Sequence, residues 1–422
     1  MFQILKNAWK IPDLRKRILY TVLLLLVFRL GSFIPVPGLN REALQQLASG
    51  GNSIFGFLDT LTGGAFAQAS IFAMSISPYI TASIIINLLT VAIPSLERLA
   101  KEGEEGRKII AQYTRYATVV LGFIQATGLY FGLRNAVNER GFLSYITITL
   151  TFTAGTAFLM WLGEQITEKG VGNGISLLIF AGIVSRIPFG INVLYQNYLN
   201  QNLNIFTLLL FVVFALAVIA AIVVMTQGER RVPVQYAKRV VGRKMYGGQS
   251  THIPIKVNTA GVIPIIFAMS IMAFPSTIAS FFSEPAPGTF WYGFLNFIAP
   301  DSWFYGVFYF VLIIFFTFFY TAITFNPIEI ANNMKKNGGF IPGIRPGKPT
   351  SDYINKVLSR VIIVGAMFIG AIAVLPIFLN YGVGLNVYLG GTSLLIVVSV
   401  ALETVKQLES QMLMRHYKGF LE

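Results

Sequence analysis

The sequence predicts an all-α polytopic membrane protein, and two observations support that fold class. First, 55% of the 422 residues are hydrophobic and only 12% are charged, with a mean hydropathy of +0.66. A soluble domain carries about twice that charged fraction. Second, the apolar residues form blocks of about 20 residues, the length of a helix that crosses a bilayer, instead of following the period of a surface helix or strand. A soluble enzyme, a fibrous protein and a disordered chain are therefore excluded.

Ten apolar blocks are long enough to be transmembrane helices. We number them spans 1 to 10; they cover residues 18–34, 76–93, 116–133, 145–163, 175–195, 205–225, 259–282, 303–325, 360–380 and 385–406. The basic start, residues 1–17, resembles the first part of a signal peptide. Span 1 is nevertheless expected to be retained, because it is long and ends in Pro35 and Pro37 without a small-residue cleavage site.

The distribution of Lys and Arg predicts the orientation of the spans. With the N-terminus in the cytoplasm, 27 of the 32 basic residues fall in the two tails and in the loops after spans 2, 4, 6 and 8. Arg29 lies within span 1, and the other side holds Arg41, Arg134, Arg140 and Arg186. Because cytoplasmic loops carry the excess of basic residues, both termini are predicted to be cytoplasmic.

Two of the cytoplasmic loops, residues 226–258 and 326–359, are long and basic. Residues 231–236 of the first loop are strand-like, and the Pro and Gly residues of the second favour a rigid, protruding hairpin. The loops are either solvated segments that follow the charge rule or a docking surface for an anionic partner, such as RNA phosphate or an acidic protein face. The candidate binding residues are Arg230, Arg231, Lys238, Arg239, Arg243, Lys244, Lys335, Lys336, Arg345 and Lys348.

The segment before span 2 is too short and too mildly apolar to cross a bilayer. Residues 61–74 lead into Ser75-Ile76-Ser77-Pro78, where proline breaks a helix. A half-helix at membrane depth is tolerated only inside protein or beside a water-filled cavity. The pattern leaves two interpretations open: a re-entrant helix in a pore, or an amphipathic helix on the outer leaflet.

Residues for catalysis, metal binding or ion coupling are missing from the spans. There is no cysteine, His252 and His416 lie in polar segments, and residues 170–174 form a Gly-rich turn rather than a phosphate-binding loop. Arg29 is a charge well inside span 1, and snorkelling or pairing with a neighbouring helix would satisfy it. These features count against a secondary transporter and an intramembrane enzyme, and we expect neither a cofactor nor a metal.

Seven motifs together resemble those of the SecY family of protein-conducting channels. They are 34–38 (IPVPG), 78–86 (PYITASIII), 163–168 (GEQITE), 172–176 (GNGIS), 228–231 (GERR), 249–258 (QSTHIPIKVN) and 341–347 (IPGIRPG). The resemblance covers nearly the whole chain. It implies the channel subunit of the Sec translocon in the bacterial cytoplasmic membrane, which is not an enzyme and passes unfolded polypeptides across the membrane.

The resemblance also implies two inverted halves, residues 1–195 and 196–422, around an hourglass pore. The segment 63–74 would be the plug, a half-helix on the outer side that includes Gly64, Ala65, Phe66, Ala69, Ile71 and Phe72. A ring of aliphatic side chains would close the waist, because a narrow apolar pore dewets and blocks ions without any charge. By motif position the ring would contain Ile80, Ile84, Leu178 or Ile179, Ile183, Ile266 and Ile396.

Spans 2, 3, 7 and 8 would form a lateral gate to lipid. Asn87 and Gln125 would be unsatisfied amides if they faced lipid, so we expect them at the seam with span 7, near Phe274, with hydrogen bonds that hold the gate shut. The implied partners are the SecE and SecG subunits, signal sequences, nascent polypeptides, lipids, the SecA ATPase, and the ribosome with its RNA. SecA or the ribosome would supply the energy through the basic loops, where Arg345 matches the key arginine of the family.

Overall fold

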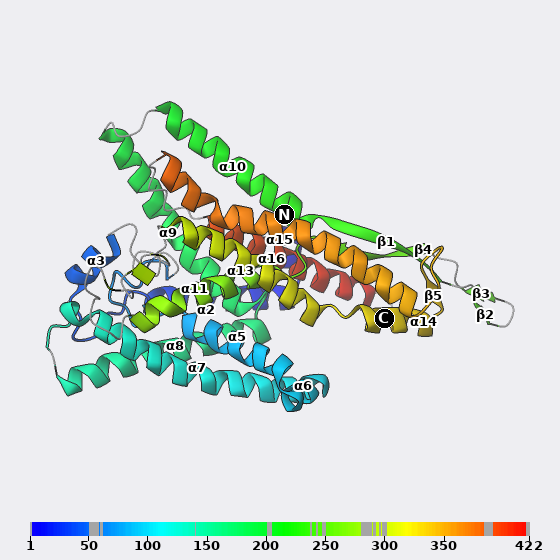
Figure 1. Cartoon of the computed structure of the whole chain (residues 1–422), viewed down its shortest axis with the longest axis horizontal. Helices are drawn as coiled ribbons and strands as arrows, with labels where there is room; N and C mark the ends of the chain where they lie inside the picture. The colour runs from blue at the N-terminus through cyan, green and yellow to red at the C-terminus, as the bar shows by residue number, and fades with distance from the viewer. Residues whose placement is uncertain are drawn as a thin grey trace.

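The computed structural model describes most of the chain. The residues outside the description are 1, 50–58, 60–61, 140, 201–204, 237–238, 242–243, 247–249, 280–288, 290–292, 295–296, 298–301, 384–390 and 419–422. For some further residues, Phe274 among them, only the backbone is described. Most described residues lie in helices that run roughly along the long axis of the molecule, and a narrow sheet extends from one end (Figure 1).

Each predicted span coincides with one helix of the described chain. The ten helices are α2 (Pro12–Gly31), α5 (Ser77–Ala92), α7 (Glu104–Gly132), α8 (Phe142–Lys169), α9 (Gly174–Leu199), α10 (Ile205–Gln227), α11 (Ile263–Ala279), α13 (Trp303–Thr324), α15 (Lys348–Val383) and α16 (Gly391–Lys418). Shorter elements stand between and before them: α1 (Phe2–Lys10), α3 (Arg41–Ser49), α6 (Pro94–Lys101), η1 (Arg134–Ala136) and α14 (Pro327–Lys336).

The all-α membrane fold is confirmed, whereas the number of membrane crossings stays a prediction. Among the described residues, six helices are long and apolar enough to cross a bilayer, and α5 with α6 would make a seventh. The apolar helix within α11 is shorter than a full span. Basic residues at the start of α2 and α7 extend these helices beyond their apolar parts, so length and composition alone do not settle each crossing.

Prolines and asparagines mark several helix boundaries. Pro94 and Pro327 stand in the first turn of α6 and α14, where a missing N–H leaves no hydrogen bond unmade. Asn173 caps α9 by accepting a hydrogen bond from Ser176 N at 3.3 Å. Because the residue before a proline avoids the helical conformation, Ile93 is extended, and α5 and α6 meet at 101°.

The two long loops form one three-stranded antiparallel sheet. β1 (Glu229–Tyr236) pairs with β4 (Ser250–Lys256) on one side and with β5 (Gly339–Phe340) on the other. A separate hairpin, β2 (Arg239–Val241) and β3 (Lys244–Tyr246), stands at the far tip (Figure 1). The sheet therefore joins segments that are about a hundred residues apart in the sequence.

Strand β1 confirms the strand predicted at 231–236. Val232 and Val234 are buried, whereas Arg231 and Pro233 are exposed, as the period of two requires. The buried side belongs to a cluster with side chains of β4, α14, α15 and the residue after β5, namely Ile255, Met334, Ile341, Ile354, Leu358 and Ile362. One hydrophobic cluster thus ties the two loops together.

The protruding hairpin predicted for 326–359 is wrong in form. The segment continues as α14, passes through β5 and a turn, and enters α15 at Lys348. Ile341 is only 3% exposed because it follows the strand that pairs with β1. Arg345, in the turn, remains exposed. Local Pro and Gly signals indicated the turn, but they could not indicate a pairing with a strand so distant in sequence.

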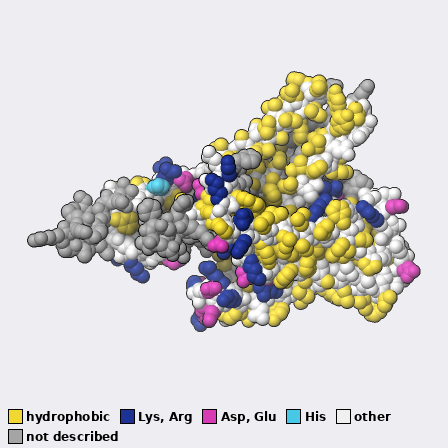
Figure 2. Space-filling model, turned by 180° about the vertical axis from the view of Figure 1, so that it is seen from behind, with side chains coloured by type: hydrophobic (Ala, Val, Ile, Leu, Met, Phe, Trp, Pro, Cys, Tyr) yellow, Lys and Arg dark blue, Asp and Glu magenta, His cyan; other side chains and the backbone are white. Residues whose placement is uncertain are grey.

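The surface of the helical body is strongly apolar (Figure 2). On α10, for example, Phe206, Leu209 and Leu216 are 75%, 59% and 61% exposed. Lys and Arg side chains gather mainly where the body meets the sheet, the end predicted to be cytoplasmic (Figure 2). An apolar band of this extent would be unfavourable in water and matches a lipid environment.

Candidate functional site

The aliphatic side chains predicted to ring the pore lie in one hydrophobic cluster. The buried ones are Ile84, Leu178, Ile183 and Ile396, and the half-buried ones are Ile80 and Ile266. Ile179 is buried in the same cluster, so Leu178 and Ile179 remain equal candidates. The fold brings these residues together from α5, α9, α11 and α16, and their role as a ring stays a prediction.

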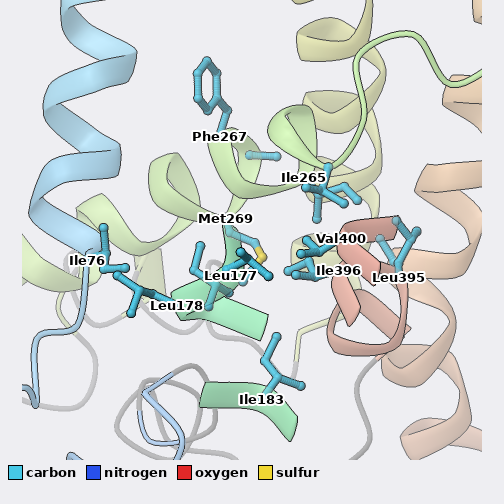
Figure 3. Close-up of a cluster of buried hydrophobic side chains, with 14 of the residues drawn as sticks. Ile76, Leu177, Leu178, Ile183, Ile265, Phe267, Met269, Leu395, Ile396 and Val400 are labelled. Atoms are coloured by element: carbon cyan, nitrogen blue, oxygen red, sulfur yellow. The ribbon is translucent and has the colours of Figure 1, made fainter. Parts of the chain in front are cut away.

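Figure 3 shows further members of this cluster that the sequence analysis missed. Leu177 and Met269 point toward Ile396, so that α9, α11 and α16 meet through their side chains, whereas Phe267 points away (Figure 3). Val400 also belongs to the cluster and follows Ile396 by one helical turn. The i, i+4 spacing on one helix face could have indicated Val400, but Met269 depends on how α11 is rotated against its neighbours.

The plug segment, which we define as residues 62–76, is not the half-helix that was predicted. It consists of successive turns, with Ala69 N donating to Phe66 O at 3.0 Å and Ser70 N to Ala65 O at 2.9 Å. Ala69 and Ser75 have φ of 54° and 52°. Such left-handed residues interrupt the i→i−4 hydrogen bonds of a helix, and non-glycine residues adopt them only when the surroundings enforce it.

The plug segment is buried inside the helical body. Its predicted residues Gly64, Ala65, Phe66, Ala69 and Phe72 are buried, and Ile71 is half-buried. The Phe72 ring lies between the rings of Phe28 on α2 and Phe158 on α8, with centroids 6.0 Å from each. The outer-leaflet helix left open by the sequence is therefore wrong, because such a helix would expose its polar face.

Backbone contacts join the plug segment to the chain that follows α2. Val36 N donates to Ala69 O at 2.7 Å, and Ile71 N donates to Ile34 O at 3.0 Å. On the other side, a side chain at Gly155 of α8 would not fit, because its Cβ would lie 2.1 Å from Ile71 O. The plug segment is thus held between α8 and the 34–38 motif, in direct continuation of the aliphatic cluster through Ala65, Phe72 and Ile76.

Two polar residues were predicted at a gate. Asn87 and Gln125 are half-buried, and the Asn87 amide donates to Ser83 Oγ of its own helix at 3.5 Å. The hydrogen bond between helices that was expected for them stays a prediction. The side chain of Phe274 lies outside the described residues. What the described part does show is that α11 packs against both α5 and α7.

The basic candidates of the loops are mostly exposed. The exposed ones are Arg230, Arg231, Lys335, Lys336, Arg345 and Lys348. Lys238 and Arg243 lie outside the described residues, and only the backbone of Arg239 and Lys244 is described. Arg231 Nε donates to Glu229 Oε1 at 2.8 Å, and this hydrogen bond lowers the pKa of the Glu229 carboxyl. The remaining exposed cations near the sheet are suited to an anionic partner.

Comparisons with known proteins agree with this geometry. The SecY family model matches residues 70–405. The protein translocase subunit SecY of Halalkalibacterium halodurans is 49% identical over 435 residues, covering 100% of both chains. A solved structure described by its SecY plug domain, which stabilises the closed channel and maintains a membrane seal, is similar with a TM-score of 0.67 and 18% identity, covering 94% of this chain and 92% of that chain. Sec61 in the canine ribosome-channel complex has a TM-score of 0.61 and 17% identity, covering 94% and 92%.

Proposed function

The chain belongs to the SecY family, and we propose that it is the channel subunit of a Sec translocase through which unfolded polypeptides cross the membrane. The observation that carries the proposal is the plug segment, a buried run of turns inside a helical membrane protein. Turns at membrane depth are tolerated only where protein surrounds them. A core that only packs helices together has no need of such turns, whereas a closure that must be displaced has a reason to contain them.

In this proposal the aliphatic cluster is the seal of the idle pore. Ile80, Ile84, Leu178 or Ile179, Ile183, Ile266 and Ile396 form the ring, and the plug segment covers it from the outer side. Aliphatic side chains cannot coordinate an ion, and a narrow apolar passage excludes water. They also fit loosely around any polypeptide, since they make no specific hydrogen bond to it. The two halves, residues 1–195 and 196–422, would surround this seal.

The lateral gate is proposed at the contact of α11 with α5 and α7, where the helices pack directly. A signal sequence would enter this seam from the lipid side and replace the contacts between the helices. SecE and SecG would be the further subunits. Because the helical surface is apolar over most of its extent, membrane-protein segments that leave the gate would meet lipid at once. The location would be the cytoplasmic membrane of a bacterium, with both termini in the cytoplasm.

The basic loops are the proposed docking surface for the motor. The sheet extends from one end of the helical body (Figure 1), and Arg345 is exposed in the turn that follows β5. A large partner could reach both. Similarity to Sec61 in a ribosome complex supports the ribosome as one partner, and its RNA would meet the exposed cations. SecA is the second proposed partner, and it would supply ATP-driven movement.

Translocation in a reconstituted system tests the function. The protein with its SecE and SecG partners is placed in lipid vesicles with SecA, ATP and a labelled precursor, and the protease-protected precursor is measured. The expected result is protection that depends on ATP and on an intact signal sequence. A matched precursor with a charged residue inside its signal sequence is the control. Vesicles in which no precursor becomes protected would overturn the proposal.

The Arg345→Glu substitution is expected to slow SecA-driven translocation roughly tenfold, since reversing an exposed charge weakens association with an oppositely charged partner. The turn itself should persist, because Thr350 Oγ1 bonds to the Arg345 backbone oxygen at 2.9 Å and not to its side chain. Arg41→Glu, which reverses an exposed charge on α3 outside both basic loops, is the control. A normal ATP-driven rate for Arg345→Glu would show that this arginine is not part of the docking surface.

A further inference from the structure

We propose that Arg29, Ser185 and Arg186 form a polar latch that holds the plug segment closed, and that this latch sets how strong a signal sequence must be to open the channel. The inference rests on the proposed function and assigns positioning residues to it. It rests on two groups of contacts with the helices α2 and α9. One group is made by the plug segment itself, and the other by Asp59, which precedes it.

The first group of contacts is centred on the carbonyl oxygen of Gly63. Arg29 Nη1 on α2 donates to this oxygen at 3.1 Å, and Ser185 Oγ on α9 donates to it at 3.3 Å. The Arg29 guanidinium also lies over the Phe33 ring, 4.8 Å from its centroid. The charge inside span 1, which the sequence left to snorkel or pair, is therefore bonded to the plug segment.

The backbones of the plug segment and α9 touch at this point. Gly63 has φ of 66°, and a Cβ there would lie 2.5 Å from Gly182 O. Only glycine permits this approach. It places the Gly63 carbonyl where side chains from both α2 and α9 can reach it, so one peptide group connects two helices.

The second group of contacts is an ion pair between Asp59 and Arg186 of α9. Asp59 precedes the plug segment and is 1% exposed. Its Oδ1 also accepts a hydrogen bond from Ala67 N at 2.7 Å, and its carbonyl oxygen accepts from Gly64 N at 2.9 Å. The same carboxylate thus shapes the first turns of the plug segment and attaches them to α9.

These contacts favour two discrete states rather than gradual loosening. Removing one partner of a buried ion pair leaves an uncompensated charge, whereas replacing both partners with neutral groups costs much less. The closed state therefore keeps both charges paired, and the open state must hydrate both. Since Arg29 and Ser185 lie on different helices, the Gly63 carbonyl cannot keep both hydrogen bonds when α2 and α9 separate.

Neutral substitutions at the ion pair test the latch. Purified Arg186→Gln, Asp59→Asn and the double variant are compared with the original protein for idle ion conductance and for export of precursors with signals of graded hydrophobicity. Each single variant is expected to increase the idle conductance at least roughly tenfold, because an unpaired buried charge destabilises the closed state. Each is also expected to export precursors with weakly hydrophobic signal sequences. The double variant is expected to leak less than either single one.

The comparison of single and double variants separates a latch from general damage. Independent structural damage would add in the double variant, so a double variant that leaks more than both singles overturns the proposal. Arg134→Gln, at an exposed arginine of η1, controls for loss of a charge. If the single variants do not insert, Ser185→Ala removes a hydroxyl that lies 3.3 Å from Gly63 O and 2.7 Å from Gly182 O of its own helix. Unchanged conductance for this variant counts against the latch. In the same vesicles, the unsubstituted protein must export the precursor with the most hydrophobic signal sequence. If it does not, the proposed function is contradicted and the latch is not the cause.

Discussion

Deleting residues 63–74 is expected to raise the idle ion conductance of the channel roughly tenfold or more, because only the aliphatic cluster would then exclude water from the pore. The deleted segment contributes Phe66 and Phe72 to the core, 1% and 2% exposed, so some stability is lost. The helices around it should still insert, because each carries its own apolar surface. Conductance is measured in planar bilayers after purification, and an unchanged value would contradict the plug assignment.

A single substitution offers a milder form of the same experiment. Gly155→Ala places a Cβ 2.1 Å from Ile71 O, a backbone atom that cannot rotate away, so the plug segment must shift. The expected result is a smaller rise in idle conductance than the deletion causes. Gly141→Ala is the matched control, because a Cβ at Gly141 meets no atom within 4 Å. Equal conductance for the two variants would mean that α8 does not hold the plug segment in place.

The spans were predictable because a bilayer imposes one rule on every crossing. A helix of about 20 apolar residues satisfies its own backbone and needs no information from distant residues. This is why α10, which is apolar on all sides, begins at the predicted Ile205 and ends two residues past the predicted limit. The prediction was weaker for α7 and α15, because no comparable rule sets the length of the charged extensions at their N-terminal ends.

The plug segment shows what local sequence could not indicate. Pro78 and the glycines suggested an interruption, but the left-handed conformations of Ala69 and Ser75 come from contacts with the chain at 34–36 and with α8. Asn87 was considered only as a partner for a neighbouring helix. A hydroxyl one turn earlier, on Ser83, also offers its amide a partner within the helix.

Part of the candidate site was predicted from the sequence, and the predicted residues were chosen on different grounds. Ile80 and Ile84 share a face of α5 by simple helical spacing, whereas Ile266 and Ile396 were placed by resemblance to a family. Arg29 was noticed as the one charge within span 1, but its partner, a backbone carbonyl, leaves no mark in the sequence. Side-chain patterns can identify a residue that needs a partner without identifying the partner.

Ile183→Ser is expected to make the idle channel conduct ions measurably even with the plug segment intact. Ile183 is 4% exposed and belongs to the aliphatic cluster. A serine there removes three carbon atoms and adds a hydroxyl, and in an ordinary core such a change costs about 3–5 kcal/mol. At the waist of a pore the same change also lets water enter, because dewetting depends on both narrowness and apolar lining. Combined with the plug deletion, the substitution should raise conductance further than either change alone.

The equally buried Ile354 separates a pore lining from a packed core. Ile354 is 0% exposed, but it belongs to the cluster that packs against the three-stranded sheet. Ile354→Ser should destabilise that cluster by a similar amount and weaken SecA-driven translocation, while the idle conductance stays at the original level. Conductance in planar bilayers and thermal unfolding in detergent are measured for both variants. If the two variants unfold alike and neither conducts, the cluster around Ile183 is packing between helices, and the seal must be sought in the plug segment alone.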